Sequence, residues 1–318
     1  MVEKEEVLPL WVRRVDTLRL GLRSNVWLQA RGVPVRGWLL QQLIKLAVAE
    51  RLTADVLVHV DSDVVLLRPF SVSSIVDQNG RVRLFALPDA VDETLPHHIR
   101  WHRAAEKLLG IAPAGFPMPD FISSLVPWKR ANALALLEHI QRTTGRHWLR
   151  ALAAVWDVSE YTLYGRFAQN VLGESAGQFV SSSSLCHDYY KRVPLSVPEL
   201  EALLDRVGPD EVAVSLTAKA GMKPENYVEV LERRWAALSA QRPASTDIHP
   251  GRRLAEHRLD EPVRADEADR SRATQATMSR GSESRGGPLT TGTNRYRIKW
   301  AIGFLVALLI VLLLFGVD

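Results

Sequence analysis

The turn Asp61-Ser62-Asp63 has the residue types best suited to chemistry in this chain of 318 residues. It follows the apolar, β-branched run 55–60 (DVLVHV), which predicts a strand that is covered on both faces. Ligands of open α/β sheets bind at the carboxyl ends of strands. Two carboxylates there can hold Mg²⁺ or Mn²⁺, while water and substrate phosphates complete the ligand shell. The simpler alternative is a polar turn that binds nothing.

Two enzyme classes use such a turn. A glycosyltransferase of the GT-A type binds its metal ion and the diphosphate of a nucleotide sugar through Asp-x-Asp. A haloacid-dehalogenase-like phosphohydrolase would instead use Asp61 as its nucleophile. That class also needs a later acidic pair such as GDxxxD, which the sequence lacks, and its first motif usually opens the domain. The first class is therefore favoured, and a catalytically inactive, membrane-anchored binding module is a third alternative.

Four segments extend this interpretation: GW…QQ…KL in residues 37–46, then HVDSDVVLLRPF, PDFISSLVPW and SEYTLYGRF. In this order they resemble a bacterial family of GT-A-like glycosyltransferases, most of it defined only as a domain of unknown function. The resemblance covers about residues 8–190. It implies a GT-A-like fold, with a mostly parallel sheet flanked by helices, and transfer of a sugar from a nucleotide sugar to an acceptor hydroxyl. Members usually begin with an earlier strand or two, so the start of this chain is expected to be truncated or divergent.

The metal and donor site is expected at Asp61 and Asp63. His187 is a candidate third metal ligand, because imidazole and two carboxylates suit Mn²⁺, and a surface histidine is the equal alternative. Lys45 and Gln42 lie on the helix before the strand. An ammonium group and an amide there can bind phosphate or sugar hydroxyls, or simply face solvent.

Two further carboxylates are candidates for catalysis. Asp120 lies between Pro119 and an apolar run, where it can accept hydrogen bonds from sugar hydroxyls or cap a turn. Glu160 follows Ser159, a predicted N-cap, and can stabilise the first turn of a helix. The alternatives for this segment are Glu160 as the base that deprotonates the acceptor hydroxyl, and acceptor binding by Glu160 or Tyr161.

Helices and strands alternate along residues 1–240, which indicates an α/β fold with a mostly parallel sheet. The first helix should bury Leu39, Leu43, Leu46 and Ala47. Helices are expected at 36–52, 97–109, 129–142, 146–155, 159–172 and 226–238. Strands are expected at 55–60, 81–87, 121–126, 178–182 and 212–216.

The net charge of +4 is concentrated near the end of the chain. Residues 241–299 hold 12 of the 40 Lys and Arg and 8 of the 36 Asp and Glu, and residue 318 is one further acid. Residues 1–240 are therefore almost neutral, with 28 basic and 27 acidic residues, which argues against a broad nucleic-acid-binding face. Residues 241–297 are rich in charged and small residues, which predicts a disordered linker.

Residues 298–317 predict a membrane anchor. The 18 residues Trp300–Val317 contain no charge, and as a helix they span about 27 Å, close to the thickness of a bilayer core. Arg295, Arg297 and Lys299 precede the span, so the positive-inside rule places residues 1–299 in the cytoplasm. We therefore expect a catalytic domain at 1–240, tethered to the inner or plasma membrane and acting on a glycan or glycolipid acceptor.

Overall fold

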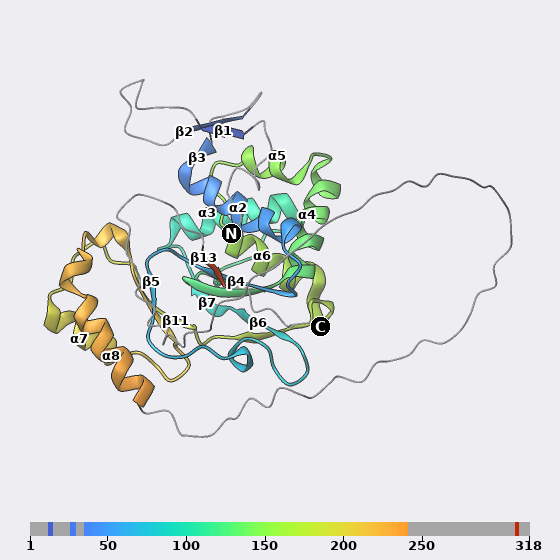
Figure 1. Cartoon of the computed structure of the whole chain (residues 1–318). Coiled ribbons are helices and arrows are strands. Elements are labelled where there is room, and N and C mark those ends of the chain that lie inside the picture. Colours follow the sequence, from blue (N-terminus) through green and yellow to red (C-terminus); the bar gives the residue numbers. More distant parts are fainter. Residues whose placement is uncertain (1–11, 15–25, 30–34, 241–308, 312–318) are drawn as a thin grey trace, which may run out of the picture. The chain divides into compact units, whose positions relative to one another are not determined.

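The computed structural model of the chain describes residues 12–14, 26–29, 35–240 and 309–311 (Figure 1). These residues all belong to one unit. Its helices are α2 (Gly37–Arg51), α3 (Pro96–Leu109), α4 (Arg130–Thr144), α5 (Trp148–Ala153), α6 (Glu160–Phe167), α7 (Val197–Leu204) and α8 (Val228–Ala240). The strands before the acidic turn are β1 (Val12–Arg14), β2 (Val26–Gln29), β3 (Val35–Arg36) and β4 (Val56–Val60). The later strands are β5 (Val64–Leu66), β6 (Val82–Phe85), β7 (Leu87–Val91), β8 (Met118–Asp120), β9 (Leu125–Lys129), β10 (Gln178–Ser181), β11 (Cys186–Tyr189), β12 (Ala213–Leu216) and β13 (Leu309–Val311).

The strands form several small sheets, and the α/β class predicted from the sequence is confirmed. The mostly parallel sheet is not found among the described strands, because only β6–β10 and β11–β12 of the eight pairings are parallel. A parallel pair needs a long crossover, usually a helix. After β4 the chain instead turns directly into β5, which pairs antiparallel with β12, and β4 itself pairs antiparallel with β9.

Helix α2 packs on the face of β4 that carries Leu57. Its predicted core residues, Leu39, Leu43, Leu46 and Ala47, are all buried. They share one hydrophobic cluster with Leu57 of β4, whereas Val58 and Val60 belong to a different cluster. Since side chains alternate along a strand, Asp61 continues the row of Leu57 and His59 on the α2 side.

Most predicted elements are present with small changes of boundary. The strand expected at 121–126 is wrong in its limits, because β8 ends at Asp120 and β9 begins only at Leu125. The Asp120 carboxylate accepts a hydrogen bond from the Ile122 N–H and turns the chain between them. The helix predicted at 159–172 ends as α6 at Phe167 and continues as a π-helical turn. The sequence did not predict helix α7 or strands β1, β2, β3, β5, β7, β8 and β11.

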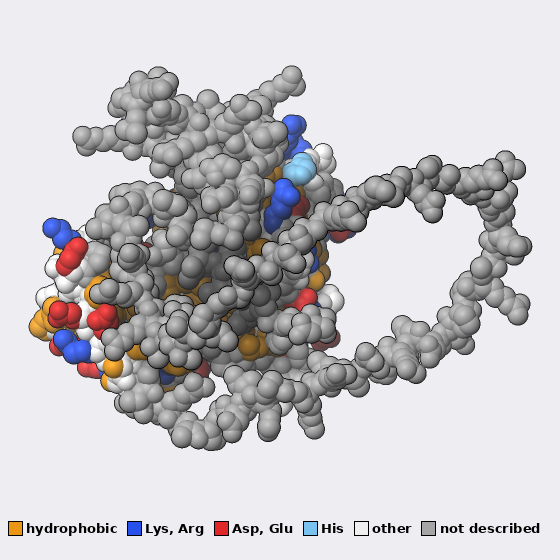
Figure 2. Space-filling model, viewed as in Figure 1, with side chains coloured by type: hydrophobic (Ala, Val, Ile, Leu, Met, Phe, Trp, Pro, Cys, Tyr) orange, Lys and Arg blue, Asp and Glu red, His pale blue; other side chains and the backbone are white. Residues whose placement is uncertain are grey.

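Acidic and basic side chains are interspersed over α7 and α8 (Figure 2). Arg233 and Arg234 of α8 pair with Glu201 and Asp205 at 3.1 Å each. The described surface of these two helices is therefore mixed in sign.

The described residues include no helix that is long and apolar enough to cross a membrane. The predicted linker, 241–297, lies outside the described residues. Of the predicted anchor, 298–317, only Leu309–Val311 is described, as the short strand β13 beside β4. The membrane anchor and the division of the chain into domains stay predictions.

Candidate functional site

The acidic turn is fixed to the neighbouring strands through its main chain. The Asp61 N–H donates to the Ser124 carbonyl oxygen at 2.9 Å. The Asp63 carbonyl accepts from the Leu216 N–H at 3.1 Å, and its carboxylate accepts from the Ala218 N–H, also at 3.1 Å. Both carboxylates are partly exposed. The turn thus presents two oriented acidic side chains at the carboxyl end of β4.

Lys45 lies beneath Asp61, with only 2 % of its side chain exposed. Its Nζ is 2.8 Å from Oδ1 of Asp61, 2.9 Å from Oε1 of Glu160 and 2.7 Å from the Tyr161 hydroxyl. Burial lowers the pKa of Lys45, but the Glu160 and Asp61 carboxylates outweigh that effect and hold the pKa well above its usual range. Three protein oxygens face an ammonium group with three N–H bonds. Lys45 therefore donates to Asp61 and Tyr161 and forms an ion pair with Glu160. It orients Asp61, and its buried ammonium group does not face a phosphate.

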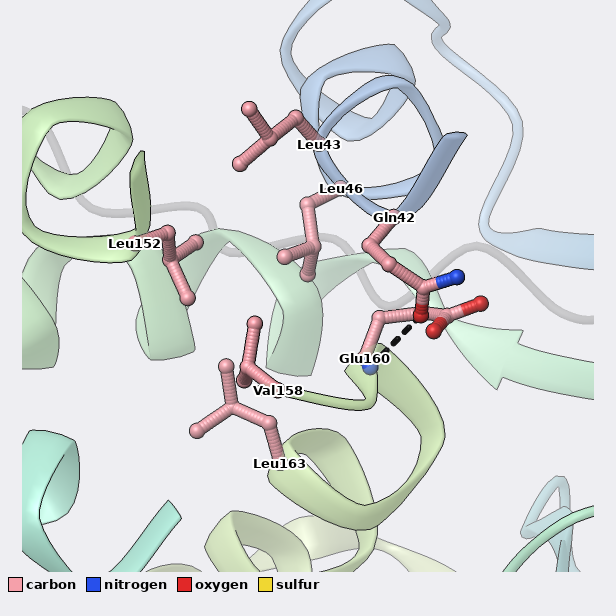
Figure 3. Close-up of a pocket in the computed structure, with 7 residues that line it drawn as sticks. All are labelled: Gln42, Leu43, Leu46, Leu152, Val158, Glu160 and Leu163. Carbon is pink, nitrogen blue, oxygen red and sulfur yellow. Dashed lines mark hydrogen bonds between the residues drawn. The ribbon is translucent and has the colours of Figure 1, made fainter. Parts of the chain in front are cut away.

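Gln42 and Glu160 join α2 to α6 (Figure 3). Ser159 is the predicted N-cap of α6, and its hydroxyl accepts from the Thr162 N–H at 3.4 Å. The Gln42 amide oxygen accepts from the Glu160 N–H at 3.1 Å, and the Glu160 side chain is only 1 % exposed. Burial raises the pKa of Glu160, partly offset by Lys45. Neither side chain meets open space, because the apolar residues beside them leave no room for a ligand: Leu43, Leu46, Leu152, Val158 and Leu163.

His187 and Asp188 lie on opposite faces of β11, since side chains alternate along a strand. His187 Nδ1 is 2.9 Å from Oε2 of Glu211. Asp188 accepts from the Ser124 N–H at 3.3 Å, and the carbonyl of the same serine accepts from the Asp61 N–H. Burial raises the pKa of Asp188. The structure thus links Asp188, which the sequence did not single out, to Asp61 through the main chain of Ser124, whereas His187 pairs with Glu211.

Within the described part of the chain, no group of three or more His, Cys, Asp or Glu side chains is close enough to hold a metal ion. A cation at Asp61 and Asp63 would therefore have two protein carboxylates at most. Mg²⁺ and Mn²⁺ accept such a set, because they keep several waters and bind substrate phosphates.

Asp120 lies at the end of β8 and has a side chain that is 20 % exposed. One of its oxygens accepts from the Ile122 N–H at 3.0 Å, as expected for a residue that caps a turn. The other is 3.4 Å from Nδ1 of His98. Asp120 is therefore held by the turn and by α3, with part of the carboxylate still open to solvent.

His98 also lines a hollow of about 640 Å³ that no sequence pattern predicted. One wall is aromatic: the rings of Trp38 and Trp101 stack at 5.7 Å, and His98 lies 4.7 Å from Trp101. Arg192 and Lys219 add two cations. Lys219 directly follows Ala218, whose N–H binds Asp63, while His98 contacts Asp120. The hollow thus adjoins both the acidic turn and Asp120.

The sequence model of a family described as "Family of unknown function (DUF6492)" matches residues 2–205. The chain belongs to this family. No protein of curated function and no solved structure matches the chain significantly. The expected membership of a family defined as a domain of unknown function is therefore confirmed, and the match includes the acidic turn, Lys45, Asp120, Glu160 and His187.

Within this DUF6492 match, the motif segments of β4, β9 and α6 pack against each other. His59 of β4 contacts Trp128 of β9 with ring centroids 4.2 Å apart. Trp128 stacks on Tyr164 of α6 at 4.5 Å and an interplanar angle of 7°. The motifs are therefore the parts of one packed layer beneath the acidic turn.

Gly165 is the point of closest packing in that layer. A Cβ on this residue would lie 2.2 Å from a ring carbon of Phe121, which is itself only 2 % exposed. Gly165→Ala should destabilise the protein by about 1–3 kcal/mol through overpacking, although alanine favours a helix over glycine by about 1 kcal/mol. Urea unfolding measures the change.

Gly115→Ala is the matched control, because a Cβ there meets nothing within 4 Å. The pair Gly165→Ala with Phe121→Leu should lose less stability than the two single changes together. A Gly165→Ala variant that is more stable than the natural chain would contradict this packing.

Proposed function

We propose that the chain is a metal-dependent glycosyltransferase that moves a sugar from a nucleotide-sugar donor to an acceptor hydroxyl. The observation that supports this most is the pair Asp61 and Asp63, partly exposed at the carboxyl end of a buried strand and next to a hollow of about 640 Å³. Concave sites with a few fixed polar groups are where small molecules bind. A GT-A-like fold is part of the proposal.

Asp61 and Asp63 would hold Mn²⁺ or Mg²⁺. Oδ1 of Asp61 contacts Lys45, so Oδ2 is the oxygen available for a cation. A bound ion would neutralise the charge that develops on the leaving diphosphate. Lys45 holds the Asp61 carboxylate in place through its hydrogen bond, and the bond between Gln42 and Glu160 holds the helix that carries Lys45.

Of the two carboxylates suggested for catalysis, Asp120 is the better placed. Its side chain is 20 % exposed and is held beside the hollow by His98. It can accept the hydrogen bond of an acceptor hydroxyl, and the proton when that oxygen attacks. Glu160, at 1 % exposure and beside Lys45, is a positioning residue in this proposal. The predicted membrane anchor would keep the domain near a glycolipid or an envelope polysaccharide precursor.

A thermal-shift panel of nucleoside diphosphates and nucleotide sugars, with and without Mn²⁺, tests the proposal. The sharpest variant is Asp63→Asn, because the asparagine oxygen can still accept from the Ala218 N–H while the negative charge is lost. At a ligand concentration about 100 times Kd, binding should stabilise the chain by roughly 2.7 kcal/mol. We expect the shift to need Mn²⁺, to disappear in Asp63→Asn and to persist in Asp210→Asn, a change at an exposed residue.

Two outcomes would contradict the proposal, and each would indicate a different function. Phosphate release without an acceptor, with a phospho-aspartate trapped at Asp61, would indicate a phosphohydrolase. Mn²⁺-dependent nucleotide binding without transfer to any hydroxyl acceptor in a broad screen would indicate a binding module.

A further inference from the structure

The hollow beside the acidic turn has an aromatic wall of a kind suited to sugars. Trp38 and Trp101 stack at 5.7 Å with 24° between their planes, and 39 % of Trp38 is exposed. The C–H-rich face of a sugar ring packs on such an apolar aromatic surface. The indole N–H of Trp101 is buried and has no acceptor among the described residues.

Two other residues of the lining are cationic. Arg192 and Lys219 are exposed, and neither has an ion-pair partner in the part of the chain that the structure describes. Asp157, the acidic residue of the lining, is already paired with Arg100 at 2.7 Å. Helix α3 begins at Pro96 on the rim, and its N-terminus adds further positive potential. The hollow therefore combines a flat apolar wall with unpaired positive charge.

We infer that this hollow is the acceptor subsite and that it takes a saccharide bearing an anionic group, a carboxylate or a phosphate. The inference rests on the proposed glycosyltransferase function. The lining includes neither Asp61 nor Asp63, so the hollow adjoins the donor site without containing its metal carboxylates. Lys219 of the lining follows Ala218, whose N–H donates to Asp63, and His98 of the lining contacts Asp120. A sugar ring on the tryptophans would have its anion at Arg192 and Lys219.

Binding of small probes to the full chain, kept in mild detergent, tests the inference. The probes are methyl glucoside, glucuronate, glucose 6-phosphate and inorganic phosphate, each titrated by calorimetry without Mn²⁺ or nucleotide. Glucuronate and glucose 6-phosphate should each bind at least about tenfold more tightly than methyl glucoside, because a hydrogen bond to a charged group outweighs a neutral one. A preference for one of the two identifies the anion as carboxylate or phosphate.

Arg192→Ala and Lys219→Ala should each lower the affinity for the anionic sugars about tenfold and leave the affinity for methyl glucoside unchanged. Lys191→Ala is the matched control, since Lys191 is the exposed neighbour of Arg192 and does not line the hollow. Trp101→Leu should lower the affinity for all three sugars and leave the affinity for inorganic phosphate unchanged.

Equal affinity for neutral and anionic sugars would overturn the inference. So would a loss of nucleoside diphosphate binding, rather than of sugar binding, in Arg192→Ala, because the hollow would then belong to the donor. Asp63→Asn separates the two proposals, since it should abolish Mn²⁺-dependent nucleotide binding and keep the anionic sugars bound. If anionic sugars bind through Arg192 while no nucleotide binds, the hollow is still a site for anionic saccharides, but the glycosyltransferase proposal and the acceptor role fail.

Discussion

Lys45→Met should destabilise the protein by about 3–5 kcal/mol, the cost of leaving a buried charge without its partner. Glu160 is 1 % exposed, and among the described residues Lys45 is the cation within 4.0 Å of its carboxylate. Methionine fills a similar volume without charge, so the loss reports electrostatics rather than a cavity. Urea unfolding at pH 7 measures the free energy of unfolding for both proteins.

The loss should depend on pH. Burial raises the pKa of Glu160 even beside Lys45, and removal of the ammonium group raises that pKa further. A carboxyl group with a raised folded pKa destabilises the protein only where it is ionised in the unfolded chain. The difference in free energy of unfolding between the natural chain and Lys45→Met should therefore be smallest below about pH 4.3. It should grow as the pH rises from the folded pKa of Glu160 in the natural chain toward the higher folded pKa in the variant.

Two further variants complete this test. Lys107→Met removes an exposed lysine and should change stability by no more than about 0.5 kcal/mol. Adding Glu160→Gln to Lys45→Met removes the unpaired charge and should recover part of the loss, which a double-mutant cycle detects. A Lys45→Met protein as stable as the Lys107→Met protein would contradict the buried ion pair.

The sequence predicted what depends on local pattern. Helix α2 with its four core leucine and alanine positions, strand β4, the acidic turn after it and the Ser159 cap all follow from periodicity and capping within a few residues. An apolar run predicts a strand but not the direction of its neighbours, so the prediction of a mostly parallel sheet was wrong. The partners of Lys45 were also beyond reach, because Glu160 and Tyr161 lie more than 100 positions away.

The choice of His187 over Asp188 shows the same limit. The segment CHDY has no alternating apolar pattern, so neither β11 nor its register was predicted. Knowing the strand would have placed the two side chains on opposite faces. The hollow could not be predicted from the sequence at all. Its lining residues Trp38, Trp101, Arg192 and Lys219 come from separate parts of the chain and follow no common spacing.

His102 should make the protein sensitive to mild acid. It is 1 % exposed, its Nε2 bonds to the Pro119 carbonyl oxygen at 2.9 Å, and its Nδ1 has no partner among the described residues. Burial, with the nearby charge of Arg166, lowers the pKa of His102 from 6.5 to about 4. Because the unfolded chain binds the proton first, this contribution to stability is complete above about pH 6.5 and falls by about 1.4 kcal/mol per pH unit toward pH 4.

His102→Gln isolates this effect, since glutamine can donate to the Pro119 carbonyl oxygen but does not titrate. The natural chain should be the more stable of the two at pH 7, and its advantage should shrink by roughly 3 kcal/mol between pH 6.5 and pH 4. Lys107→Met, on the same helix, should keep a constant difference over this range. An imidazole NMR signal of His102 that titrates near pH 6.5 in the folded protein would contradict the prediction, because the pKa would then be the same in the folded and the unfolded chain.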